Sequence, residues 1–203
     1  MSRLRTRPTR DDTREKLFDA AARVFEEQGI GGASIEIIAA AAGFTRGAFY
    51  SNFKSKEELI IAMLEDHVEQ SIRRIHDLLE KHKNLPDFID ALKGMDHNQQ
   101  DPLGRSPLLH MEMILFVARA EKRRPELAKR LRARRKLITD IVETTAKNAR
   151  RTTILNPGWA GAVVLALEDG FRLHRLIDPE TTPSDSFLRA IVDLQRAMGI
   201  ATA

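Results

Sequence analysis

Apolar residues recur along most of the chain at the three- and four-residue spacing of amphipathic helices, and the alternating pattern of strands is scarce. The first apolar face begins after Thr9, where Thr9-x-x-Asp12 is a capping pair, and ends at Gly29. A long helix is predicted over residues 56–82, which hold one continuous apolar stripe. Further helices are predicted between Pro86 and Leu92 and at about 106–120, 125–150, 157–177 and 185–198. We therefore expect an all-α protein of about nine helices.

The stretch "SIEIIAAAAGFTRGAFYSNFKSKEEL" predicts two short helices before the long one. Ser34 caps the first, and Glu36 in its first turn complements the helix dipole. Gly43 ends this helix, and Thr45 caps a second one that ends at Tyr50. The second helix is only about 9 Å long, which contributes little to a core. Its exposed side is therefore expected to have a function.

Two short helices joined by a glycine turn are typical of the helix-turn-helix motif. The motif needs small residues where the helices cross, which Ala39–Ala42 supply, and a positive φ in the turn, which Gly43 tolerates. Phe44 then anchors the turn in the core, and Ser55-x-x-Glu58 opens the long helix with a capping box. The second short helix is long enough to place its N-terminal end against base edges in a major groove.

At these residues the chain resembles the tetracycline-repressor (TetR) family of bacterial transcriptional regulators. The resemblance runs from "AARVFEEQG" through "ASIEIIAAAAGFTRGAFYSNFKSKEEL". It implies an N-terminal arm and DNA-binding domain at residues 1–54 and an effector-binding and dimerisation domain at residues 55–203, connected by the helix 56–82. It also implies three partners, which are double-stranded operator DNA, a small-molecule effector and a second copy of the chain.

The resemblance places three residues on the groove-facing side of the second short helix: Thr45, Arg46 and Ala48. It places the following at the DNA backbone: Ser34, Tyr50, Asn52 and Lys56. Arg46 is the expected base contact, since arginine pairs bidentately with guanine, and Lys56 offers a point charge to phosphate. Gly47 stands where the family commonly has a bulkier residue or proline. The full set is Ser34, Thr45, Arg46, Gly47, Ala48, Tyr50, Asn52 and Lys56.

Several residues of this region also have a purely structural interpretation. Phe49 and Phe53 are assigned to packing, and Ser34 and Thr45 are helix caps before they are phosphate contacts. Lys56 taken alone would be a solvated charge. The arginines at positions 3, 5, 7 and 10 are interpreted as a solvated tail, with insertion into a minor groove as the alternative.

The last two predicted helices, Pro157–Ile177 and Ser184–Met198, are the expected dimer contact. The first is apolar on more than one face and rich in Ala and Gly, which permits close helix approach. One chain needs a single buried face, so the excess apolar surface indicates a partner. The alternative is burial of that surface inside one chain.

A bulky apolar effector is expected in the C-terminal domain. The proposed contacts combine adaptable apolar side chains with charged groups: Met111, Met113, Phe116, Arg119, Trp159 and Glu168. The alternative is that the methionines belong to the core. The basic segment 122–136 is interpreted as a solvated surface, and a second nucleic-acid surface there is the less favoured interpretation.

Composition excludes several classes of protein. The chain has 33 Lys and Arg against 29 Asp and Glu and contains no cysteine, so thiolate catalysis and disulfides are excluded. No secretory signal peptide or membrane span is expected, which indicates a cytoplasmic protein. No cofactor, metal site or catalytic residue is expected, because phosphate-loop, nucleophile-elbow and histidine-pair motifs are missing. Lone histidines such as His67, His76 and His174 are assigned to the surface or to interfaces.

The sequence thus predicts a homodimeric regulator, a repressor that binds a near-palindromic operator and is released by its effector. The helix 56–82 would transmit the change between the domains. A helix-turn-helix regulator without a small-molecule effector is the alternative, and an all-α enzyme is a third, disfavoured class.

Overall fold

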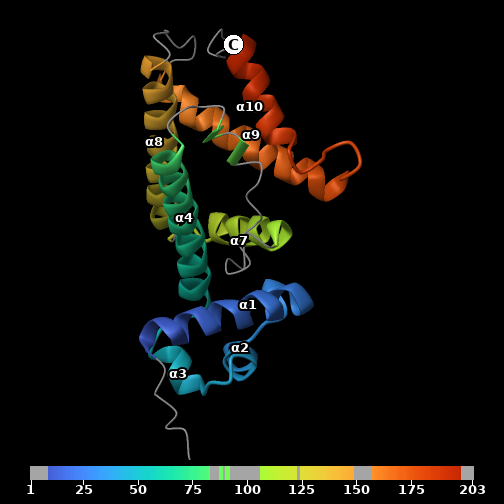
Figure 1. Ribbon diagram of the computed structural model, residues 1–203. Coiled ribbons are helices and arrows are strands. Elements are labelled where there is room, and N and C mark those ends of the chain that lie inside the picture. The colour runs from blue at the N-terminus through green and yellow to red at the C-terminus, as the bar shows by residue number, and fades with distance from the viewer. Residues whose placement is uncertain are drawn as a thin grey trace, which may run out of the picture. The chain divides into compact units, whose positions relative to one another are not determined.

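The computed structural model describes residues 9–82, 87–88, 90–91, 106–122, 124–148 and 157–197. Its eight labelled helices are α1 (Arg10–Gly32), α2 (Ile35–Ala41), α3 (Arg46–Tyr50), α4 (Lys56–Lys81), α7 (Pro107–Arg119), α8 (Arg124–Asn148), α9 (Pro157–Ile177) and α10 (Ser186–Ala197) (Figure 1). The all-α class is confirmed. The arginines at positions 3, 5 and 7 lie outside the described residues, as do Pro86, Ile89 and Leu92 of the helix predicted after Pro86. Residues 87–88 and 90–91 of that predicted helix are helical.

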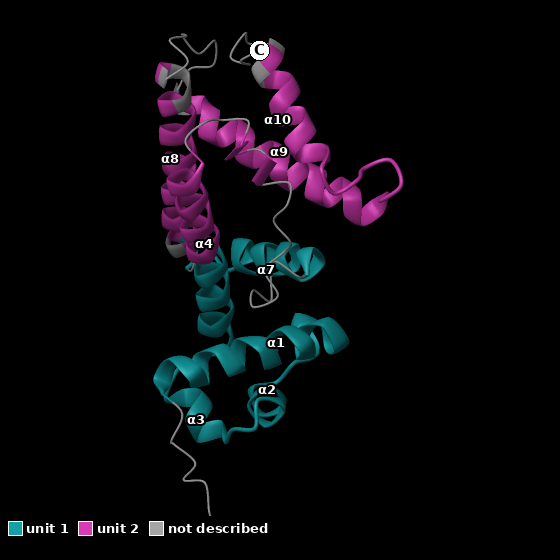
Figure 2. Cartoon of the chain, viewed as in Figure 1, with its two compact units in different colours: residues 1–67, 100–124 teal, residues 68–99, 125–203 magenta. Residues whose placement is uncertain are grey.

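The chain divides into two compact units (Figure 2). Unit 1 combines Met1–His67 with Gln100–Arg124, and unit 2 combines Val68–Gln99 with Pro125–Ala203. Helix α4 contributes its first half to unit 1 and its second half to unit 2. The division into domains at residues 54 and 55 stays a prediction, because the units are defined by packing between separate segments.

In unit 1, α1 packs against α2 and α7, and α2 packs against α3. Phe49 and Phe53 are 0% and 1% exposed, which confirms their assignment to packing. The Phe53 ring lies 5.7 Å from that of Phe18 and 5.8 Å from that of Phe49, between centroids. Each such buried aromatic side chain stabilises the fold by about 1.5–3 kcal/mol. Helix α3 and the turn that follows it are therefore joined to α1 by one aromatic cluster.

The helix ends in unit 1 follow the sequence closely. Thr9 and Asp12 form the predicted capping box, with both reciprocal hydrogen bonds present. Gly29 and Gly43 adopt φ values of 71° and 74°, the left-handed region that glycine enters without a Cβ clash. One more helical turn, up to Gly32, follows the break at Gly29, where the sequence predicted only a turn.

The capping box predicted at the start of α4 is only half formed. The backbone N–H of Glu58 donates to the Ser55 hydroxyl at 3.2 Å, as expected. The Glu58 carboxylate instead accepts from the N–H of Lys54, at 2.9 Å. The Glu58 carboxylate therefore accepts a hydrogen bond from the backbone N–H of the residue before the cap, and not from the N–H of Ser55 itself.

Two residues that the sequence placed at exposed or interfacial positions, His67 and Arg134, are buried. His67 is 4% exposed, and its ring centroid lies 4.5 Å from that of His110, which is also buried within unit 1. Arg134, in the basic segment, is 7% exposed and donates to the Glu168 carboxylate at 2.8 Å. His67 was expected at the surface or at an interface and Arg134 on a solvated surface, so both expectations are wrong for these two residues. Other residues of the basic segment are exposed as expected: Arg132, Arg135 and Lys136. A single residue in a polar segment carries no signal of the helix that covers it.

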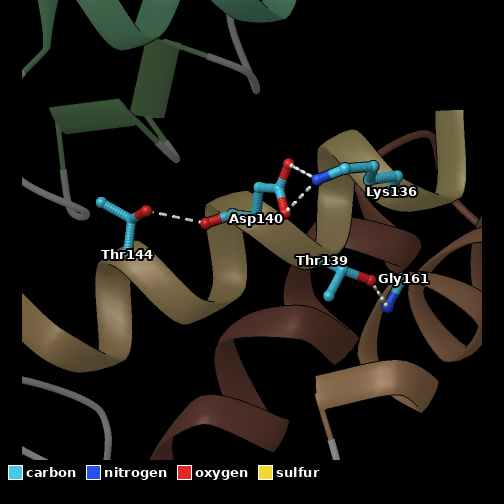
Figure 3. A network of polar contacts seen from close by, with 5 residues as sticks. All are labelled: Lys136, Thr139, Asp140, Thr144 and Gly161. Atoms are coloured by element: carbon cyan, nitrogen blue, oxygen red, sulfur yellow. Dashed lines mark hydrogen bonds and ion pairs between the residues drawn. The ribbon is translucent and has the colours of Figure 1, made fainter. Parts of the chain in front are cut away.

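In unit 2, α8 and α9 approach closely at Gly161. The backbone N–H of Gly161 donates to the Thr139 hydroxyl at 3.2 Å, and a Cβ at Gly161 would collide with the Arg135 carbonyl oxygen (Figure 3). On another side of α8, Lys136 pairs with Asp140 (Figure 3). The two helices are therefore held together by backbone contact that only glycine permits.

Within the described residues, no helix combines the length and apolar character that a membrane crossing requires.

Candidate nucleic-acid interface

Helices α2 and α3 each have a buried side and a side that is exposed to solvent. Ile38 and Ala39 on α2 and Phe49 on α3 face inward and are buried. Thr45, which caps α3, and Arg46 and Gly47 on α3 are exposed, and Ala48 is half-buried. The three predicted groove residues, Thr45, Arg46 and Ala48, therefore lie on one helical turn that is accessible from solvent. Helix α3 has five residues, or about 7.5 Å of helix, which fits within the width of a major groove.

The turn between the two helices is set by local hydrogen bonds. The Ser34 hydroxyl accepts the N–H of Ile37, and the Thr45 hydroxyl accepts the N–H of Ala48, each at 3.2 Å. Both residues are therefore caps, as the sequence predicted. Phe44 donates its N–H to the Ala39 carbonyl but its side chain is half-buried, so it closes the turn more than it fills the core.

Arg46 is held by two partners. Its Nη1 lies 3.1 Å from Oε1 of Glu36, and its Nη2 donates to the Tyr50 hydroxyl at 3.4 Å. The guanidinium carbon also lies 5.4 Å from the centroid of the Tyr50 ring, within cation–π range. The Tyr50 hydroxyl, followed by the Glu36 carboxylate, raises the pKa of Arg46, so the guanidinium stays charged.

Asn52 and Lys56 are engaged with the backbone of the protein. The Asn52 amide donates from Nδ2 to the Ala48 carbonyl at 2.9 Å. The Lys56 ammonium donates to the carbonyls of Ile30 and Ala33 at 2.6 and 2.8 Å, which fixes the start of α4 to the end of α1. Their phosphate contacts stay predictions, and Lys56 has a structural role that the sequence did not indicate.

The geometry brings part of the predicted set together. The Glu36 carboxylate pairs with Arg46 and accepts from the Ser34 hydroxyl, and Tyr50 joins this group through its contact with Arg46. Glu36 was assigned only to the helix dipole. A signal was available, since an acidic first turn on one short helix and an arginine at the start of the next suit an ion pair.

The six predicted effector contacts are divided between the two units. Four lie on α7 in unit 1: Met113 is fully buried, Met111 and Phe116 are half-buried, and Arg119 is exposed. Two lie on α9 in unit 2, where Trp159 is 66% exposed and Glu168 accepts from Arg134 and Arg172 at 2.8 Å each. Met113 thus matches the alternative interpretation as a core residue. The effector contacts stay predictions.

Comparisons with known proteins agree with this geometry. Residues 17–63 match the family model described as bacterial regulatory proteins of the tetR family. The chain is 35% identical over 91 residues to the HTH-type transcriptional regulator TtgR of Pseudomonas putida, an alignment that covers 45% of this chain and 41% of TtgR. The chain therefore spans about two-fifths of the length of that curated relative.

Two solved structures resemble the chain over most of its length. NemR from E. coli, in its reduced form, has a TM-score of 0.70 and 26% identity, with 90% of this chain and 96% of NemR covered. FadR from Bacillus subtilis, in complex with stearoyl-CoA, has a TM-score of 0.64 and 16% identity, with 92% and 98% covered. The N-terminal helix-turn-helix and the C-terminal helical domain are thus both parts of a known fold.

Proposed function

We propose that this chain, which belongs to the tetR family of bacterial regulatory proteins, is a transcriptional repressor that binds a near-palindromic operator as a homodimer. A small-molecule effector, bulky and apolar, binds in the C-terminal domain and releases the repressor from DNA. Its place of action is the cytoplasm, where the chromosome lies.

The observation that carries DNA binding is the exposed first turn of α3. Its polar and small residues are accessible, while Phe49 on the same helix is buried in the aromatic cluster. A rigid support and an exposed N-terminal end are what a recognition helix needs to place side chains against base edges. Arg46 is the residue with the chemistry for a bidentate contact to guanine.

The homodimer is supported by exposed apolar residues on α9. Leu173, Leu176 and Ile177 have the spacing of one helical face and are 42%, 39% and 77% exposed. A twofold-symmetric pair of such faces buries them against each other and presents two recognition helices to the two halves of a palindrome.

The effector is supported by the fold. FadR from Bacillus subtilis holds stearoyl-CoA in a chain of the same architecture, so this architecture accommodates a bulky ligand with a long apolar acyl chain. An effector that binds better to the arrangement incompatible with the operator shifts the population toward the free protein.

The test is selection of duplexes from a random pool by the purified full-length protein at moderate ionic strength. We expect enrichment of a near-palindrome, and lower expression of a reporter placed behind it. No enrichment would contradict DNA recognition, and higher reporter expression would identify an activator. Loss of operator binding on addition of an apolar compound distinguishes the effector-responsive regulator from one without an effector.

The Arg46→Ala variant tests the base contact. We expect a loss of about 1–3 kcal/mol per base contact on the selected duplex, with relaxed preference at that position. Binding measured by fluorescence anisotropy on duplexes with single base-pair changes checks it. Unchanged preference at every position would remove Arg46 from base recognition.

A further inference from the structure

Glu36 lies beside the predicted DNA-contacting residues but was not among them. It occupies the first turn of α2, and its Oε1 lies 3.1 Å from Nη1 of Arg46 on α3. The side chains are 54% and 64% exposed, so the pair lies at the surface that holds the groove residues. A carboxylate on a surface that approaches phosphates is repelled by them, so its presence there calls for an explanation.

The carboxylate is fixed in its ionised form. Its own backbone N–H and the Ser34 hydroxyl donate to it, and these bonds, with Arg46, lower the pKa of Glu36. The charge is therefore present at neutral pH, and the side chain is held by the same residue that caps α2.

Arg46 is constrained from the other side by Tyr50. The hydroxyl contact at 3.4 Å and the ring contact at 5.4 Å hold the guanidinium between α2 and the end of α3. The arginine is thus positioned before DNA arrives, and its charge is already balanced by Glu36. Because the ion pair is exposed, it is weak enough to be exchanged for a better partner.

We propose that Glu36 is a specificity-determining residue, which neutralises and positions Arg46 so that the arginine contacts a base edge instead of a phosphate. A phosphate near Arg46 is repelled by the adjacent carboxylate, whereas the guanine edge is uncharged and offers two acceptors. The pair therefore weakens binding to random sequences more than binding to the operator. This inference rests on the proposed DNA-binding function.

The test compares the full-length wild-type protein with Glu36→Gln on two probes. One is the duplex that the wild-type protein selects from a random pool, and the other is a duplex of random sequence. We expect the ratio of specific to random affinity to fall by about two- to tenfold, the value of one immobilised side chain. On the random duplex, the slope of log K against log salt should become steeper by up to about 0.9, since Arg46 then neutralises one phosphate.

Two controls separate this role from a change in overall charge or folding. Glu27→Gln removes the same charge from the exposed surface of α1 and should leave both measurements unchanged. In an Arg46→Ala background, Glu36→Gln should have no further effect on base preference. Glu36→Asp, which keeps the charge, should restore part of the discrimination.

The outcomes distinguish a failure of the role of Glu36 from a failure of the proposed DNA-binding function. A wild-type protein that selects no duplex would overturn the proposed function and the role of Glu36 with it. A wild-type protein that selects a duplex, with Glu36→Gln equally discriminating, would overturn the role of Glu36 alone. An equal effect of Glu27→Gln, or a full effect in the Arg46→Ala background, would also overturn it.

Discussion

Lys56 shows how a side chain predicted to contact phosphate also has a structural role. Its ammonium group donates to the carbonyls of Ile30 and Ala33, which lie at the end of α1 and have no helical partner further along the chain. A cation at this position also complements the negative end of the helix dipole. The lysine therefore joins α1 to the start of α4.

We predict that Lys56→Ala lowers the free energy of unfolding by about 1–3 kcal/mol, because two charge-assisted hydrogen bonds are lost. Urea unfolding of the variant checks this. Lys54→Ala is the matched control, since Lys54 is exposed and its substitution should change stability by less than about 0.5 kcal/mol. A variant of unchanged stability whose salt slope on DNA falls by about 0.9 would assign Lys56 to phosphate contact alone.

Arg46 illustrates how far sequence reasoning reaches for a single site. Its residue type and its place at the start of a short capped helix predicted a base contact. Its partners, Glu36 and Tyr50, lie ten positions before it and four after it, and only the turn at Gly43 brings Glu36 within 3.1 Å. The exposed position of Arg46 follows from local spacing, and its base contact stays a prediction. The charges of Glu36 and Arg46 suit an ion pair, but only the crossing of the two helices brings the side chains together.

Helices α8 and α9 show the same limit for pairs of elements. The Ala- and Gly-rich sequence of α9 predicted a close helix approach, and the expected neighbour was a second copy of the chain. At Gly161 the close neighbour is α8 of the same chain, through Arg135 and Thr139. For this residue, the alternative interpretation of burial within one chain is correct. The composition of a helix predicts that something packs closely, but not what.

We predict opposite effects for two glycine substitutions on α9. Gly161→Ala should lower the free energy of unfolding by about 1–3 kcal/mol, because the methyl group would meet the Arg135 carbonyl and the helices would have to separate. Gly170→Ala should raise it by up to about 1 kcal/mol, since a Cβ there has nothing within 4 Å and alanine favours helix. The urea midpoints of the two variants measure these changes in stability. Equal shifts of the two midpoints would contradict the close contact between α8 and α9 at Gly161.

At the scale of the whole protein, the exposed apolar face of α9 is the feature that a single chain does not explain. Leu173, Leu176 and Ile177 lie near the C-terminal end of the helix, and Leu194 on α10 is also exposed. Helix α10 packs against α9, so these side chains belong to the same helix pair. Burial against a second copy would remove their apolar area from water.

We predict that Ile177→Glu weakens the homodimer at least tenfold, because it places a charge in the proposed apolar interface. Sedimentation equilibrium measures the dissociation constant, and affinity for the selected duplex should fall in parallel. Leu115→Glu, on α7 in unit 1, removes an exposed leucine outside the proposed interface and should leave the mass unchanged. A dimer that tolerates Ile177→Glu but not Leu115→Glu would move the interface to α7.

The sequence by itself determined the helices, their caps at Thr9, Ser34 and Thr45, the glycine breaks and the helix-turn-helix. These features depend on periodicity and on hydrogen bonds within four residues, so the neighbouring residues in the sequence determine each of them. Only the tertiary structure decided that Lys56 binds the end of α1, that Arg46 pairs with Glu36, and that Gly161 packs against α8. Those contacts join residues from different helices, and their distances follow from packing that no local pattern encodes.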